Sequence, residues 1–124
     1  MQTVFLDGET MTTADAFAVA RGLATVEIAA DAIPKIEAAQ RVVGEIISSG
    51  ETVYGINTGF GALVNQRIGT EDLATLQLNL IRSHACGLGE PLDIQTARGM
   101  MLVRANTLAK GHSGSRIRVI QQLV

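Results

Sequence analysis

Hydrophobic residues recur at helical spacing along much of the chain. The clearest stretch begins at residue 32, where apolar side chains repeat every three to four residues and would share one helix face. These side chains are Ala32, Ile36, Ala39, Val43 and Ile46. Pro34 lies near the start, where a missing amide donor costs least, and Gly50 follows the last apolar position. We therefore expect a helix that starts near residue 32 and that Gly50 ends.

The first thirty residues carry strand and turn signals. Residues 4–6, the dipeptide Asp7-Gly8 and residues 10–11 predict a small β-hairpin, because Asp-Gly supplies the positive φ angles of a tight turn. The other expected elements are a short helix capped by Thr12 that runs to about Arg21 before Gly22, and a short strand over 23–28.

Three more helices are expected in the second half. They are a helix capped by Thr70 that ends near Gly87, one opened by Asp93 that ends at Lys110-Gly111, and one that starts around Ser113 or Ser115. The side chains expected to face inward are Leu73, Leu76, Leu80 and Ile81, then Ala97, Met100, Met101, Leu108 and Ala109. The last helix still runs at Val124 without a stop signal, so we expect the chain to be cut inside a larger fold.

The composition favours packed helices. Hydrophobic residues make up 47% of the 124 residues but aromatics only 3%, so the core must be aliphatic and rich in alanine. A mainly α fold with one domain over 1–124 follows. The net charge of -2 gives no strong field for nucleic acid or anionic membranes.

The cysteine count, the N-terminal sequence and the apolar runs indicate the cellular compartment. Cys86 is the single cysteine, which excludes an intrachain disulfide and is consistent with a reducing, cytoplasmic setting. The N-terminus lacks the pattern of a signal peptide, and no apolar run approaches the roughly 20 residues of a membrane span. We therefore expect no membrane partner.

A glycine-rich segment, residues 51–69, shows no helical period and is expected to be a loop with unusual backbone angles. A phosphate-binding loop would need Lys and Ser or Thr directly after the last glycine, and neither is present. A dinucleotide-binding loop needs the spacing Gly-x-Gly-x-x-Gly, whereas this loop has Gly-x-x-x-Gly-x-Gly. On these residues alone, the alternative is a tight loop that has no binding or catalytic role.

The residues 54–61, YGINTGFG, closely resemble the Tyr-Gly-x-Asn-Thr-Gly-Phe-Gly signature of the aromatic amino acid ammonia-lyases. These enzymes use a methylidene-imidazolone (MIO) electrophile. Residues 72–92 and 102–114 resemble the next two helices of the family and their connections. The resemblance covers nearly the whole chain, is weakest in the first 30 residues, and implies the N-terminal domain of the MIO ammonia-lyase fold.

The resemblance makes Tyr54 the candidate catalytic base or acid. A free tyrosine has a pKa of about 10, so the site must favour the phenolate if Tyr54 is to take a proton from the substrate β-carbon. Gly61 is implied to contact the substrate, and Asn57 to brace the loop. The other implied supports are Gly55, Thr58, Gly59 and Phe60. The alternative to this catalytic role, for Tyr54 taken by itself, is a half-buried aromatic residue whose hydroxyl lies at the surface.

The dipeptide Ser83-His84 matches the pair that helps to select the substrate ring in this family. Ser-His is the pattern of histidine lyases, and His84 can donate or accept a hydrogen bond to an imidazole. The alternative to ring selection is that His84, a lone histidine near a helix end, caps the helix. His112 is expected in a turn between helices, Arg116 matches a basic position to which we assign no role, and Ser115 replaces an expected aliphatic residue. No spacing of His84 and His112 to carboxylates or thiols predicts a metal site.

The family's MIO forms from an Ala-Ser-Gly triplet, which this chain lacks. The resemblance therefore implies an N-terminal segment of a homotetrameric enzyme that converts L-histidine to trans-urocanate and ammonia in histidine catabolism, with the segment inactive alone. The alternatives are a tyrosine or phenylalanine ammonia-lyase or aminomutase, and a non-catalytic helical binding module.

Overall fold

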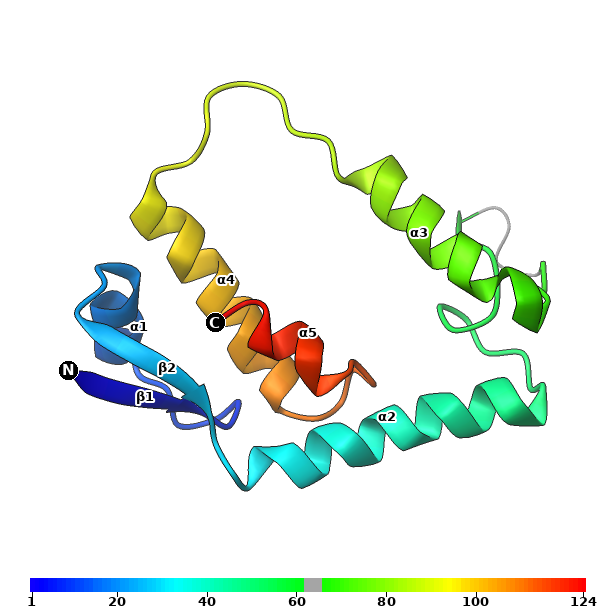
Figure 1. Ribbon diagram of the computed structural model, residues 1–124, viewed down its shortest axis with the longest axis horizontal. Helices are drawn as coiled ribbons and strands as arrows, with labels where there is room; N and C mark the ends of the chain where they lie inside the picture. The colour runs from blue at the N-terminus through cyan, green and yellow to red at the C-terminus, as the bar shows by residue number, and fades with distance from the viewer. Residues whose placement is uncertain (62–65) are drawn as a thin grey trace. The chain divides into compact units, whose positions relative to one another are not determined.

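The computed structural model describes residues 1–61 and 66–124 (Figure 1). The chain divides into two compact units, one made of residues 1–42 and 91–124 and the other of residues 43–90. Helices predominate in both units, which confirms the expected mainly α fold.

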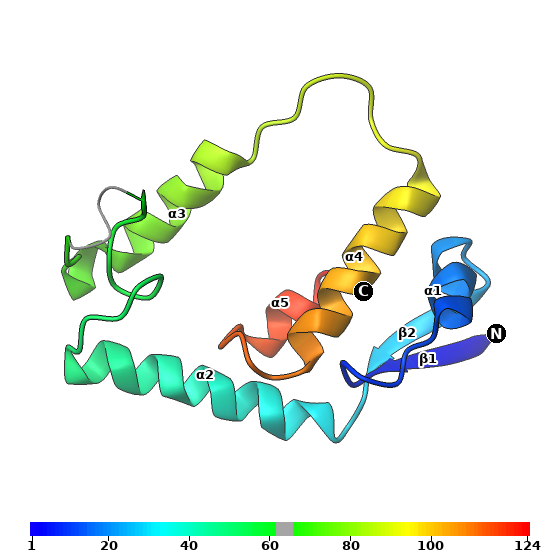
Figure 2. The ribbon, with the colours of Figure 1, turned by 180° about the vertical axis from the view of Figure 1, so that it is seen from behind.

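The first unit starts with two parallel strands joined by a helix. Strand β1 (Gln2–Leu6) pairs in parallel with β2 (Ala24–Ile28), with Gln2 opposite Ala24 and Leu6 opposite Ile28, and helix α1 (Thr13–Ala20) connects them. Figures 1 and 2 show the two strands side by side. Thr12 caps α1 as predicted. Its hydroxyl accepts from the Asp15 N–H, and the Asp15 carboxylate accepts from the Thr12 N–H.

The predicted β-hairpin is wrong. The Asp7-Gly8 turn does form, and Gly8 has a φ of +87°. However, the Asp7 carboxylate accepts hydrogen bonds from the backbone N–H groups of Glu9 and Thr10, at 2.7 and 2.8 Å. A returning strand would need such N–H groups for pairing, so the chain turns into α1 and β1 pairs with the predicted strand of residues 23–28 instead.

The core of the first unit lies where β1 and α1 meet helix α4 (Ile94–Ala109), which also contacts α5 (Ile117–Gln121). Its buried hydrophobic residues are Val4, Leu6, Ala24, Ala32, Ile36, Leu102, Ala105, Leu108, Ala109 and Ile120. Leu108 and Ala109 face inward as predicted, but Met100 and Met101 are 60% and 42% exposed. Leu102 and Ala105 occupy the buried positions instead, so the predicted phase of the α4 stripe was wrong in its first half.

Helix α2 (Ala32–Ser49) confirms the clearest prediction from the sequence. Ala32 and Ile36 are buried, and Ala39, Val43 and Ile46 are partly buried on the same face. The helix ends before Gly50, which has a φ of +72°.

The second unit holds the end of α2, the loop after it, a 3₁₀ turn η2 (Thr70–Asp72) and α3 (Leu73–His84). Thr70 does not cap the helix, because η2 intervenes and is closed by a hydrogen bond from the Asp72 N–H to the Gly69 carbonyl. α3 ends three residues before Gly87, and Ile81 is 63% exposed rather than buried.

The predicted helix in the last residues is shorter at both ends. It begins after Arg116 rather than at Ser113 or Ser115, and it ends at Gln121 rather than running to Val124. Its cap, Gln122, donates its N–H to the Arg118 carbonyl. Helix α4 begins and ends as predicted, with the Asp93 carboxylate accepting from the Thr96 N–H at 3.0 Å and Lys110 as its last cap.

Candidate functional site

The glycine-rich loop between α2 and η2 is held by pairing between its two limbs. Thr58 and Arg67 form an antiparallel bridge. Next to it, the Gly59 N–H donates to the Gln66 carbonyl at 2.9 Å and the Ile68 N–H donates to the Asn57 carbonyl at 3.0 Å. The signature residues therefore lie on one limb, and a return limb of residues 66–68 supports them from the backbone.

Tyr54 lies at a tight turn near the start of this loop. Ile56 and Asn57 both donate their N–H groups to the Val53 carbonyl, at 3.1 and 3.3 Å, so the chain reverses around Tyr54 and Gly55. Gly55 has a φ of +80°, which an L side chain rarely adopts. The turn leaves Tyr54 61% exposed.

The ring of Tyr54 packs against Phe60. The two ring centroids are 6.2 Å apart with an interplanar angle of 65°, which is an edge-to-face arrangement. Six positions separate the two residues in sequence, so the loop brings its first and second-last signature residues together. Within the part of the chain that the structure describes, the Tyr54 hydroxyl makes no hydrogen bond and is open to a ligand.

The loop glycines leave open space beside their backbone. Among the described residues, a Cβ built at Gly55 or at Gly61 would meet no atom within 4 Å, and Gly61 has a φ of +58°. The positive φ angles favour glycine at these two positions, because L side chains rarely adopt them.

The Asn57 side chain hydrogen-bonds the limb of the signature residues to the backbone just before it. Its side-chain oxygen accepts from the Val53 N–H at 2.9 Å, and its amide nitrogen donates to the Glu51 carbonyl at 2.7 Å. Only 4% of the residue is exposed. Together with Thr58, it is one of two buried polar residues among those described, and every buried hydrophobic residue of the core belongs to the first unit. Among the described residues of the second unit, hydrogen bonds of these two buried polar side chains support the loop.

Ser83 and His84 occupy the last turn of α3, in the same unit as the loop. The Ser83 hydroxyl donates to the Leu80 carbonyl at 2.9 Å. His84 Nδ1 lies 2.9 Å from that same carbonyl and 2.9 Å from Ser83 Oγ. Because a carbonyl oxygen only accepts, the proton of a neutral His84 ring belongs on Nδ1, which leaves Nε2 as an acceptor.

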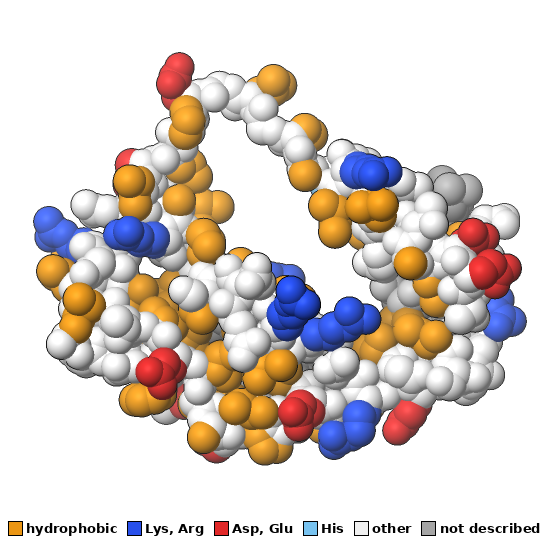
Figure 3. Space-filling model, in the orientation of Figure 1, with side chains coloured by type: hydrophobic (Ala, Val, Ile, Leu, Met, Phe, Trp, Pro, Cys, Tyr) orange, Lys and Arg blue, Asp and Glu red, His pale blue; other side chains and the backbone are white. Residues whose placement is uncertain are grey.

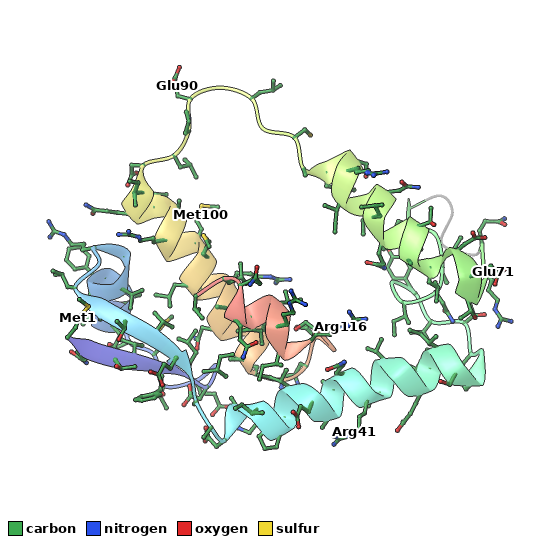
Figure 4. All side chains as sticks on the ribbon, viewed as in Figure 1. Met1, Arg41, Glu71, Glu90, Met100 and Arg116 are labelled. Atoms are coloured by element: carbon green, nitrogen blue, oxygen red, sulfur yellow. The ribbon has the colours of Figure 1, made fainter. Side chains whose placement is uncertain are left out.

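The other predicted positions lie in the first unit. His112 is in the turn between α4 and α5, and Arg116 is the residue before α5, as Figure 4 shows for Arg116. A cavity of about 530 Å³ in this unit is lined by α1, β2 and α4 side chains that include Val19, Thr25 and Arg98. None of the predicted site residues lines that cavity.

Three carboxylates of the first unit have lowered pKa values because of hydrogen bonds. The Thr10 N–H, the Thr10 hydroxyl and the Glu9 N–H lower the pKa of Asp7 to about 2. The Thr12 hydroxyl and N–H lower the pKa of Asp15, and the Thr96 hydroxyl and N–H do the same for Asp93. These groups stabilise a turn and two helix starts, and they lie outside the loop.

Sequence reasoning missed the partners that hold the loop. Glu51, Val53, Gln66 and Ile68 all act through backbone atoms, which carry no residue-type signal. The Arg67 side chain also lies close to Gly50, because a Cβ built on that glycine would be 2.9 Å from Arg67 Nη2. Its charge thus lies at the C-terminal end of α2, whose last turn has no basic residue of its own.

Within residues 1–61 and 66–124, no three His, Cys, Asp or Glu side chains gather closely enough to hold a metal ion. None of the helices in these ranges combines the length and apolar character of a membrane span.

Comparison with known proteins identifies a family. The sequence model of the aromatic amino acid lyases matches residues 11–124. Histidine ammonia-lyase from Staphylococcus aureus (strain bovine RF122 / ET3-1) is 48% identical over 121 residues, which cover 98% of this chain and 24% of the relative. The chain therefore spans about a quarter of the length of the curated relatives it matches.

Solved structures agree with this comparison. Histidine ammonia-lyase from Trypanosoma cruzi matches with a TM-score of 0.87 and 43% identity, over 99% of this chain and 24% of that one. Tyrosine aminomutase from Streptomyces globisporus matches with a TM-score of 0.91 and 35% identity, over 98% of this chain and 23% of that one. The loop motif, the fold and these similarities together show that the chain belongs to the aromatic amino acid lyase family.

Proposed function

We propose that this chain is the N-terminal segment of a histidine ammonia-lyase, and that the full-length enzyme converts L-histidine to trans-urocanate and ammonia. The similarity that carries the proposal is the 48% identity to a histidine ammonia-lyase over nearly the whole chain. The solved tyrosine aminomutase is less similar, at 35% identity. The complete signature loop in residues 54–61 is the part of this chain that serves the chemistry.

Tyr54 is the acid or base of this proposal. In the elimination, the substrate β-carbon loses a proton, the bond between the α-carbon and nitrogen breaks, and a double bond forms between the α- and β-carbons. Tyr54 acts in its phenolate form, and its phenolic oxygen accepts the β-proton and becomes the neutral hydroxyl. Its exposed side chain and its place on a turn stabilised by hydrogen bonds support this role, because a base must reach the substrate from a fixed position.

Gly61 contacts the substrate in this proposal. The open space at its Cβ position allows a substrate to approach the backbone. Gly55 gives the same freedom next to Tyr54, and its positive φ turns the chain so that the tyrosine projects from the loop.

His84 selects the substrate ring. The Leu80 carbonyl favours a proton on Nδ1, so Nε2 of the neutral ring presents a lone pair. A histidine substrate has a ring N–H that can donate to this lone pair, whereas an unsubstituted phenyl ring has no such donor. Ser83 shares the Leu80 carbonyl and helps to fix the orientation of His84.

The full-length enzyme needs its electrophile. The MIO group, formed from an Ala-Ser-Gly triplet outside these 124 residues, supplies an electron-poor carbon that activates the amino acid for loss of ammonia. The residues present fit such a partner, because Tyr54 is exposed and no described atom lies within 4 Å of a Cβ built at Gly55 or Gly61. An Ala-Ser-Gly triplet in the full-length sequence is the direct check of this part.

A homotetramer in the cytoplasm completes the proposal. Exposed hydrophobic side chains on α4 support burial against parts of the assembled enzyme outside this chain. They are Ile94, Met100, Met101 and Val103, and Figure 3 shows hydrophobic side chains at the surface of the N-terminal half of α4. A surface of this kind is typical of an unmet interface.

An aminomutase acting on tyrosine is the second candidate, favoured by the TM-score of 0.91 to the solved tyrosine aminomutase. The two are separated by incubating the full-length enzyme with L-histidine and with L-tyrosine and identifying the products. We expect urocanate and ammonia from histidine, and a loss of that activity of about 10- to 100-fold in His84→Leu, the cost of one hydrogen bond to the substrate ring. A β-amino acid product, or tyrosine as the better substrate, would support the aminomutase instead.

A further inference from the structure

Thr58 is buried within the loop. Only 1% of it is exposed, although its side chain carries a hydroxyl. Thr58 Oγ1 accepts from the Gly55 N–H at 3.3 Å and donates to the Gly59 carbonyl at 2.9 Å. Both hydrogen-bonding functions of this hydroxyl are therefore used inside the loop.

The two partners of this hydroxyl flank the aromatic pair. Gly55 directly follows Tyr54, and Gly59 directly precedes Phe60. The hydroxyl thus links the peptide group next to one ring to the peptide group next to the other, and those rings meet edge to face at 6.2 Å.

The backbone of Thr58 has a separate task. It forms the antiparallel bridge with Arg67 on the return limb. The Asn57 side chain hydrogen-bonds to the backbone of Glu51 and Val53, at the start of the same limb. A change at the Thr58 side chain that keeps its β-branched shape leaves these contacts in place. The contribution of the hydroxyl can therefore be separated from the general support of the loop.

We propose that Thr58 is a positioning residue for Tyr54, and that its hydroxyl sets the Tyr54–Phe60 pair so that the phenol faces the substrate. The inference rests on the proposed function in one respect, which is the role of Tyr54 as acid or base. Thr58 acts through the aromatic pair and does not itself touch the substrate.

The test uses the full-length enzyme with Thr58→Val, which removes the hydroxyl at nearly constant shape, and Thr58→Ser, which keeps it. We expect Thr58→Val to lower kcat for ammonia release from histidine by about 10- to 100-fold, the cost of a small misplacement of a reacting group. KM should change by less than about threefold, and Thr58→Ser should restore kcat to within about fivefold of wild type. Thr25→Val, at an exposed strand position with a hydroxyl bonded to Thr3, is the matched control and should leave kcat unchanged.

A double-mutant cycle with Phe60→Leu separates positioning from general support. If Thr58 acts through the pair, Thr58→Val should cost less than about twofold once Phe60→Leu has broken it. An equal loss in both backgrounds would overturn the proposal, as would near-normal kcat in Thr58→Val.

Hydrogen–deuterium exchange of the peptide over residues 53–61 gives a readout that does not need activity. Exchange should be at least about tenfold faster in Thr58→Val than in wild type and near wild type in Thr58→Ser, because an amide exchanges when its hydrogen bond opens. Unchanged exchange would overturn the proposal. An enzyme that releases no ammonia from histidine but still shows this exchange pattern would contradict the proposed function and leave the coupling of Thr58 to the loop standing.

Discussion

The side chain of Asn57 should control how often the Tyr54 turn opens. Asn57→Leu keeps the branching of the side chain at Cγ but removes both hydrogen bonds, to the Val53 N–H at 2.9 Å and to the Glu51 carbonyl at 2.7 Å. The Val53 N–H is partly buried, and leaving it without a partner costs about 1–3 kcal/mol. Glu51 is exposed, so water can satisfy its carbonyl and the loss there is about 0.5–1.5 kcal/mol.

The two losses together are roughly 1.5–4.5 kcal/mol of local stability. Since 1.4 kcal/mol is a factor of ten, the open population of the loop should rise by about 10- to 1500-fold. Chymotrypsin cleavage after Tyr54 or Phe60 in the full-length enzyme reports this population when reclosing is faster than cleavage. The cleavage rate should rise by that factor. Asn57→Asp keeps the acceptor for the Val53 N–H and loses only the bond to Glu51, so its cleavage rate should rise by only about 2- to 12-fold. A cleavage rate within threefold of wild type in Asn57→Leu would refute the reasoning.

Three other predictions concern the chain and its first unit. The isolated chain 1–124 should form no urocanate from histidine, because it lacks Ala-Ser-Gly, and measurable formation would contradict the cofactor assignment. Ile36→Ala, at 1% exposure, should lower the free energy of unfolding by about 2–5 kcal/mol in thermal or urea denaturation, whereas Val42→Ala, at 53% exposure on the same helix, should change it by less than about 0.5 kcal/mol. Asp7 has a pKa lowered to about 2, so its stabilising contribution is present above its ordinary pKa near 4 and is lost as pH falls towards 2. Asp7→Asn should flatten the acid limb of a stability–pH curve, and an unchanged limb would rule out that contribution.

Helical periodicity predicted most of the fold. The stripe of α2, the cap of α1 and the start of α4 follow from residues that act locally, such as Thr12 and Asp93. These features depend on neighbours within one or two turns. A single sequence therefore contains the information needed to place them.

The wrong predictions concern segments whose local sequence is compatible with two different structures. Asp7-Gly8 forms the same turn in a hairpin and in a turn towards a helix, and the carboxylate hydrogen bonds that decide between them are not a sequence pattern. Met100 and Met101 are as apolar as Leu102, so composition did not fix which face of α4 packs against α1 and β1. Thr70 resembles a cap, but a 3₁₀ turn precedes the helix.

The loop shows the same division. The motif located Tyr54 and the glycines, because unusual backbone angles restrict residue type. The hydrogen bonds that order the loop depend on backbone atoms of the return limb and on the buried side chains of Asn57 and Thr58. Their burial among polar partners has no hydrophobic signature, so the sequence did not reveal how the aromatic pair is positioned.

The most direct test of the central claim is the turnover of L-histidine by the full-length enzyme and its Tyr54→Phe variant. We expect the wild-type enzyme to release urocanate and ammonia in equal amounts. The variant should be about 10²- to 10⁴-fold slower, the usual contribution of a general acid or base. Its thermal midpoint should stay within a few degrees, because Tyr54 is 61% exposed and phenylalanine keeps the ring that packs edge to face on Phe60. Near-normal turnover in Tyr54→Phe, or no urocanate from the wild-type enzyme, would contradict the account.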